Sequence, residues 1–251
     1  MGTVVGVTLR VDEPALARQG FDVAFGAIEA GEAELSAWRP GSATARLAAG
    51  APVALSPEAE RLFDFGLRLA TRSGGRFDLM WRGGSLGRGA DGWSASAEPD
   101  LGGVLKGWLN DRAAAALLAA GFSDFLLDAA GDLLAHGDGP SGRGWWVAVN
   151  DGTRVSRPVR LRDQALSTSG DSARPGHIHD AAGPVHRRGV AVVVAPSGMV
   201  ADAVATAVYA GARRDVGAPW GARVLRVPGR RLAAAPVERV RPRASEPAAP
   251  R

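Results

Sequence analysis

Cysteine is absent from this 251-residue chain. Its absence excludes disulfide bonds, thiolate nucleophiles and cysteine-ligated zinc sites. Long apolar runs are absent too, and no stretch of about 18 apolar residues could form a membrane-spanning helix. The first residues, MGTVVGVTLRVD, lack the basic and apolar segments of a secretory signal. We therefore expect a protein without a membrane segment, located in the cytoplasm.

Excess positive charge is confined to the end of the chain, although the formal net charge is +4. Seven Arg and two Glu lie from Arg226 onward, so the preceding 225 residues carry a net charge of −1. This distribution argues against nucleic acid as a partner, because nucleic-acid binding needs cations clustered on the folded domain. Residues 236–251 are basic and rich in Pro and Ala, which is typical of a disordered tail.

Hydrophobic periodicity predicts an α+β fold. Amphipathic patterns and end signals predict helices over residues 14–38, 57–75, 104–121 and 199–212. Apolar and alternating runs predict strands over residues 3–11, 123–129, 132–137, 144–150, 157–161, 164–169, 189–198 and 222–227, with 82–100 as a loop. GDGPSG (137–142) matches a nucleotide-binding pattern, but a strand follows it, so we interpret it as a turn. We expect a mixed or antiparallel sheet packed by about four helices, forming one compact unit over residues 1–235.

Lysine is nearly absent, since Lys106 is the only one beside 29 arginines. It lies in DLGGVLKGWLND (100–111), where two glycines precede a predicted helix. Glycines at a helix start let backbone N–H groups approach an anion, and a lysine one turn later can meet a phosphate as a point charge. The alternative is an ordinary helix start with a surface lysine.

Polar side chains gather in ALSTSGD (165–171) and HIHD (177–180). His177 and His179 would share one face of a strand and could bind a metal. A histidine there could instead act as a general base. A polar surface loop without a chemical role is the third interpretation.

Asp202 and Thr206 are four residues apart in GMVADAVAT (198–206), and therefore share one face of a predicted helix. A carboxylate and a hydroxyl suit Mg²⁺, which prefers oxygen ligands. Alternatively, Asp202 favours the helix dipole and Thr206 bonds a backbone carbonyl.

Two aromatic segments could contact a planar ring. LSAWRPGS (35–42) places Trp38 beside an arginine, and SGGRFDLMW (73–81) places Phe77 and Asp78 after a glycine pair. Such aromatics could stack on a ring that the carboxylate hydrogen-bonds. They could equally be core residues beside a helix end.

The order of these motifs resembles one family. MGT, LSAWRPGS, SGGRFD, DLGGVLKG, a Gly-Asp pair, TSGD, HIHD and ADAVAT follow the pattern of the FAD:protein FMN transferases, the ApbE-like flavin transferases, from Met1 to about residue 235. The resemblance implies Mg²⁺-dependent cleavage of FAD. FMN would be attached by a phosphoester bond to a Thr or Ser of a target flavoprotein, and AMP would be released.

The resemblance also implies roles for individual residues. Catalysis is expected from Lys106, His177 as the base for the acceptor hydroxyl, and Asp202. Mg²⁺ ligands are expected from Asp202, Thr206 and the backbone carbonyl of Gly103. The expected FAD contacts are Met1, Trp38, Arg76, Phe77, Asp78, Asp100, Lys106, Ser169 and His177. Lys106 would then lie at the pyrophosphate, where the planar fork of arginine is not an equivalent substitute.

Two segments depart from the family pattern. AAGD (129–132) stands where GGD is usual, and HIHDAAG (177–183) lacks a proline and is one residue shorter. The second change lies beside His177 and favours two alternatives to transfer. These are a Mg²⁺-dependent FAD pyrophosphatase, which releases FMN and AMP, and a non-catalytic FAD-binding protein.

Overall fold

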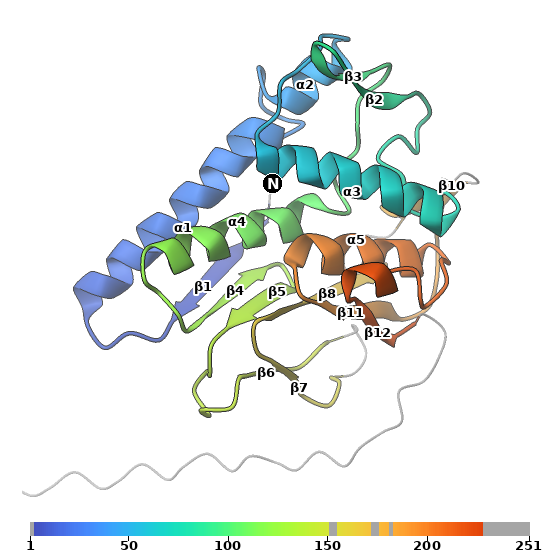
Figure 1. The fold of residues 1–251 in the computed structure, drawn as a ribbon. Coiled ribbons are helices and arrows are strands. Elements are labelled where there is room, and N and C mark those ends of the chain that lie inside the picture. Colours follow the sequence, from blue (N-terminus) through green and yellow to red (C-terminus); the bar gives the residue numbers. More distant parts are fainter. Residues whose placement is uncertain (1–2, 151–154, 172–175, 181–182, 228–251) are drawn as a thin grey trace, which may run out of the picture.

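The computed structural model describes residues 3–150, 155–171, 176–180 and 183–227. Met1 and the predicted tail, residues 236–251, lie outside the described residues. A six-stranded antiparallel sheet forms the centre of the molecule (Figure 1). Its strand order is β1 (Val5–Leu9), β4 (Phe125–Ala129), β5 (Asp132–His136), β8 (Gln164–Gly170), β11 (Val190–Ala195) and β12 (Arg223–Arg226).

Helices cover one face of this sheet. The described helices are α1 (Pro14–Leu35), α2 (Ala43–Ala48), α3 (Pro57–Ser73), α4 (Leu105–Ala119) and α5 (Gly198–Tyr209), with a short 3₁₀ turn at Ala218–Trp220. α4 and α5 pack directly on the strands, α1 lies along α4, and α3 lies over α5 (Figure 1). The main apolar core fills the space between these helices and the sheet.

A small hairpin covers the opposite face. β6 (Trp145–Val147) pairs with β7 (Val159–Leu161), and a second apolar cluster is centred on Trp145, Leu161 and Val192. β11 is buried along its whole length because it is covered on both faces. This burial agrees with its continuous apolar sequence.

The α+β class and the single compact unit are confirmed. Ser56 and Ser197 cap the N-termini of α3 and α5, because their side chains accept hydrogen bonds from backbone N–H groups of the first turn. The first helix ends at Leu35 rather than Trp38, because the chain turns to an extended conformation at Ser36.

The prediction of a loop over residues 82–100 is wrong. This segment contains a hairpin of β2 (Leu86–Gly89) and β3 (Gly92–Ala95). Trp93 anchors it, packing against Phe63 with ring centroids 5.3 Å apart and pairing with Val53. Only one large buried side chain, Trp93, lies in this Gly- and Ser-rich segment, which gives too weak an alternation to predict a strand. The short helix α2 was not predicted either.

Candidate active site

The crossing of α4 and α5 builds the floor of the site. Gly107 and Gly198 meet at this crossing so closely that a Cβ atom on Gly107 would overlap the Gly198 carbonyl. Each helix supplies a carboxylate to the first turn of the other. Asp202 of α5 accepts a 3.1 Å hydrogen bond from the Gly107 N–H. Asp111 of α4 accepts bonds from the N–H groups of Gly198, at 2.6 Å, and Met199, at 2.9 Å. These N–H groups have no partner within their own helices, so the exchange fixes the crossing.

An ionic cluster lies at this crossing. The ammonium of Lys106 binds the carboxylate of Asp132, at the start of β5, and lies 3.6 Å from Asp202 Oδ1. The Ser167 hydroxyl of β8 donates to the other oxygen of Asp132. The Asn110 side chain of α4 donates to the Asp132 carbonyl at 2.8 Å. One ammonium therefore faces two buried carboxylates, and the cluster carries a net negative charge when all three groups are ionised.

This environment changes the pKa values of the cluster. Burial and the nearby charge of Asp132 raise the pKa of Asp202 to about 7, against the opposing effects of Lys106 and the Gly107 N–H. Burial lowers the pKa of Lys106, but the charges of Asp202 and Asp132 outweigh this effect and keep it above its ordinary value. Lys106 is therefore a permanent cation, whereas Asp202 changes charge near neutral pH.

Further oxygen atoms adjoin the cluster. Ser169 Oγ of β8 lies 3.3 Å from Thr206 Oγ1 of α5. A Cβ on Gly103 would lie 3.0 Å from the same Thr206 oxygen, so the backbone at Gly103 borders this hydroxyl. The structure thus brings the predicted metal ligands Gly103 and Thr206 together, and Thr206 lies one turn after Asp202 on α5.

A second group of residues surrounds Asp100, which the sequence predicted as a FAD contact. Its carboxylate accepts hydrogen bonds from the Trp81 indole N–H, at 2.7 Å, and from the Gly102 N–H, at 2.8 Å. Arg82 lies 4.7 Å above the Trp81 ring and 3.8 Å from Asp100. Because Gly102 adjoins Gly103, these contacts join the Asp100 group to the backbone that borders Thr206.

The segment that carries His177 is attached to the Asp100 group. The ring of His179 stacks on Trp81, with centroids 4.2 Å apart and planes inclined by 10°. Asp180 pairs with Arg76 at 2.5 Å. His179 and Asp180 form β9 (His179–Asp180), which pairs with β10 (Gly183–Pro184). Within the described residues no three His, Asp or Glu side chains are arranged to hold a metal.

The remaining predicted residues are dispersed. Trp38 is 87% exposed between α1 and α2. Phe77 is buried in the main core, and its N–H bonds the Ser73 hydroxyl at 3.1 Å. Asp78 accepts a 2.8 Å bond from the Met80 N–H. The prediction for Met1 lies outside the described residues.

A family model described as the ApbE family matches residues 1–84 and 93–218. The chain belongs to the ApbE family. A curated relative from Rhodobacter capsulatus, named FAD:protein FMN transferase, is 30% identical, and the match covers 76% of this chain and 47% of the relative. This chain therefore spans about half the length of that relative.

Solved structures share the ApbE fold. The flavin transferase ApbE from Vibrio cholerae has a TM-score of 0.69 at 20% identity, covering 86% of each chain. The apo flavinyl transferase ApbE from Pseudomonas stutzeri has a TM-score of 0.66 at 20% identity, covering 83% of this chain and 84% of the other. Residues 85–92, which the family model leaves out, fall in the β2–β3 hairpin. This ApbE chain therefore departs from the family pattern at that hairpin.

Sequence reasoning missed several residues of the ApbE site. Asp132 and Ser167 complete the ionic cluster, and Trp81 joins Asp100 to His179. One signal was present for Ser167. Residues two apart on a strand share a face, so Ser167 and Ser169 both had to point toward the helices if either did. No local signal pairs Asp132 with Lys106, because that contact depends on the tertiary fold.

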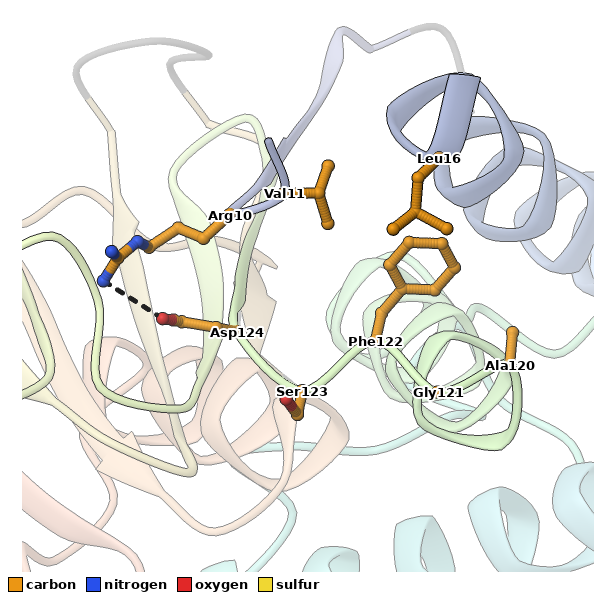
Figure 2. A pocket seen from close by; sticks show the side chains of 8 residues that line it. All are labelled: Arg10, Val11, Leu16, Ala120, Gly121, Phe122, Ser123 and Asp124. Carbon is orange, nitrogen blue, oxygen red and sulfur yellow. Dashed lines mark ion pairs between the residues drawn. The ribbon is translucent and has the colours of Figure 1, made fainter. Parts of the chain in front are cut away.

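A separate hollow of about 130 Å³ lies at the other end of α4 (Figure 2). Figure 2 shows Phe122 facing Leu16, with Arg10 pointing toward Asp124. The two ends of the 15-residue α4 are about 22 Å apart. None of the described site residues above lines this hollow, which places it outside the site.

Proposed function

We propose that this chain is a Mg²⁺-dependent FAD:protein FMN transferase. The observation that carries the proposal is the buried group of Lys106, Asp132 and Asp202 beside the Thr206 hydroxyl. Membership of the ApbE family and the name of the R. capsulatus relative support the flavin chemistry. The match spans only about half of that relative, so activity, substrate and acceptor are parts of the proposal.

The residues at the site fit a hard divalent cation. Asp202 is a buried carboxylate, and its burial and the nearby charge of Asp132 raise its pKa. The Thr206 hydroxyl lies one helical turn after Asp202 and borders the Gly103 backbone, which gives an all-oxygen donor set. Mg²⁺ takes such donors and keeps several of its waters. In this proposal Asp202, Thr206 and the Gly103 carbonyl hold the ion, which would neutralise charge on the pyrophosphate of FAD.

Lys106 supplies a second positive centre. Asp132 and Ser167 hold its ammonium beside the first turn of α4, the end of the helix that favours anions. We assign Lys106 to the pyrophosphate oxygens, where a fixed cation stabilises the charge that develops as AMP leaves. Asp132 restricts the position of the ammonium and prevents it from binding only to Asp202.

The other roles follow the family pattern. Asp100, with Trp81 and Arg82, offers a carboxylate, an aromatic ring and a guanidinium for binding FAD. Ser169 adjoins Thr206 and faces the same substrate. His177 is exposed. The segment that carries it is attached to this site by the stacking of His179 on Trp81. His177 would take the proton of the hydroxyl that attacks the phosphorus of the FMN half.

A FAD pyrophosphatase is the second candidate. The shortened HIHDAAG segment lies beside His177, and this departure favours water as the attacking hydroxyl. Both candidates use the same phosphorus, the same leaving AMP and the same ionic cluster. They differ only in the source of the hydroxyl.

Product analysis separates these functions. The purified chain is incubated with FAD, Mg²⁺ and peptides that carry a Thr or Ser, and products are identified by mass spectrometry. A peptide that gains FMN while AMP appears supports the transferase. Free FMN and AMP across a panel of peptides and flavoproteins favour the pyrophosphatase. If FAD binds and stays intact, the chain is a non-catalytic FAD-binding protein, and both enzymatic functions are refuted.

A further inference from the structure

A second pair of titratable side chains lies beside the site and is unused in the mechanism above. Asp171 directly follows β8, two residues after Ser169. Its Oδ2 lies 2.7 Å from His186 Nδ1, and its Oδ1 accepts a 2.5 Å hydrogen bond from the Gly176 N–H. Gly176 immediately precedes His177. One carboxylate therefore orients the His186 ring and also fixes the backbone just before His177.

The His186 segment is attached to the helix that carries Asp202. The Tyr209 hydroxyl of α5 accepts a 3.1 Å hydrogen bond from the Arg187 N–H and donates a 2.8 Å bond to the Arg187 carbonyl. Tyr209 lies three residues, almost one turn, after Thr206. Burial raises the pKa of the Tyr209 hydroxyl, so it stays neutral and keeps both bonds at physiological pH. The residue after His186 is thus anchored to α5 almost one turn beyond Thr206.

The pair has the character of a base with its orienting acid. The hydrogen bond from His186, followed by that from Gly176, holds the pKa of Asp171 below its ordinary value. An ionised Asp171 at Nδ1 favours the tautomer in which Nε2 carries the lone pair. His186 is 63% exposed, so its ring is accessible to a substrate. Among the described residues, the titratable or charged groups that face the pair are His177, Tyr209 of α5 and the adjoining Arg187.

We propose that His186, oriented by Asp171, is a second general base of this active site; the inference rests on the flavin-transfer function proposed above. The oxygen of the incoming hydroxyl forms a bond to the phosphorus of the FMN half. The bond from that phosphorus to the bridging oxygen breaks, and AMP leaves with that oxygen. Where water supplies that hydroxyl, its proton passes to Nε2 of His186 and then to solvent, whereas His177 serves the hydroxyl of a protein acceptor. His186 is a catalytic residue in this account, and Asp171 is a positioning residue.

Single substitutions test the two roles. His186→Gln is expected to lower kcat for FAD cleavage about 10²-fold or more, the usual contribution of a general base, with KM for FAD little changed. The pH profile of kcat should also change in this variant. Asp171→Asn should lower kcat and shift this pH profile, whereas Asp171→Glu should partly restore both. His136→Gln is the matched control, because it removes a histidine that faces Asp163 at 3.3 Å, at the opposite end of β5 from Asp132.

Chemical protection gives a readout that does not depend on turnover. Diethylpyrocarbonate labels exposed histidines, and peptide mapping distinguishes the four in this chain. FAD should slow the labelling of His186 and leave that of His136 unchanged. Equal labelling of His186 with and without FAD would overturn the inference, even in a chain that cleaves no FAD. A His186→Gln variant that keeps more than half of the wild-type kcat, beside an inactive His177→Gln, would also overturn it while leaving the proposed function intact.

Discussion

Replacing Lys106 by Met would leave two buried carboxylates without their shared counter-charge. The side chains of Asp132 and Asp202 are only 4% and 3% exposed, so water cannot replace the ammonium. Removing one partner of a buried ion pair costs about 3–5 kcal/mol, whereas an exposed pair contributes less than about 1 kcal/mol. We therefore expect Lys106→Met to lower the free energy of unfolding of the metal-free protein by about 3–5 kcal/mol at about pH 8.

The size of this loss should depend on pH. Lys106 normally lowers the pKa of Asp202, which is about 7 in the native chain, so the substitution raises it further. Below that pKa the carboxyl of Asp202 is protonated in the native state. In the unfolded chain its pKa is ordinary, so it stays ionised down to a much lower pH. Proton binding then favours the native state of the variant as pH falls. The loss of stability should accordingly be smaller at about pH 5.5 than at about pH 8.

Urea denaturation followed by circular dichroism, with a chelator present, measures this loss at both pH values. The control is Arg61→Met, which removes an exposed ion pair to Glu58 at 3.0 Å and should cost less than about 1 kcal/mol. Lys106→Met combined with Asp202→Asn should recover part of the loss at about pH 8, because one unpaired charge is removed. A Lys106→Met variant as stable as the Arg61→Met control would refute the account of a buried, charge-coupled cluster.

Two further predictions concern the helix crossing. Gly107→Ala should destabilise the protein by more than about 3 kcal/mol, because its Cβ would overlap the Gly198 carbonyl. The control is Gly26→Ala in α1, which has open space around it and should stabilise the protein by about 0.5–1 kcal/mol. Thermal unfolding of both variants measures this difference, and equal shifts in the unfolding temperature would contradict it. Asp111→Ala should cost about 2–4 kcal/mol, because it leaves the N–H groups of Gly198 and Met199 without their acceptor. The control in urea denaturation is Asp64→Ala, which removes an exposed carboxylate of α3. A comparable loss of stability in this control would contradict the special role of Asp111.

Local pattern predicted the elements that obey one period throughout. The buried run of β11 and the amphipathic α3 with its Ser56 cap were predictable because neighbouring residues carry the signal. The β2–β3 hairpin was not, since its burial depends on Trp93 meeting Phe63 across the fold.

The site divides in the same way. Asp202 and Thr206 were predicted from their helical spacing. The alternative interpretation related Asp202 to the dipole of its own helix, but Asp202 accepts a hydrogen bond from the first turn of α4, and Asp111 of α4 accepts one from the first turn of α5. This exchange, like the binding of Lys106 by Asp132, joins residues that only the tertiary fold brings together. Sequence spacing cannot encode such pairs without knowledge of the helix crossing.

The rate of AMP release from FAD tests the central claim most directly. The assay compares the wild-type chain with two variants, Asp202→Asn and the control Asp22→Asn, in the presence of Mg²⁺ and in the presence of a chelator. Asp22 is an exposed carboxylate of α1. We predict Mg²⁺-dependent release by the wild type and by Asp22→Asn, and a loss of at least about 10²-fold in Asp202→Asn. Release that persists in the chelator, or that is equally fast in Asp202→Asn, would contradict the assignment of the Lys106, Asp132 and Asp202 cluster as the catalytic centre.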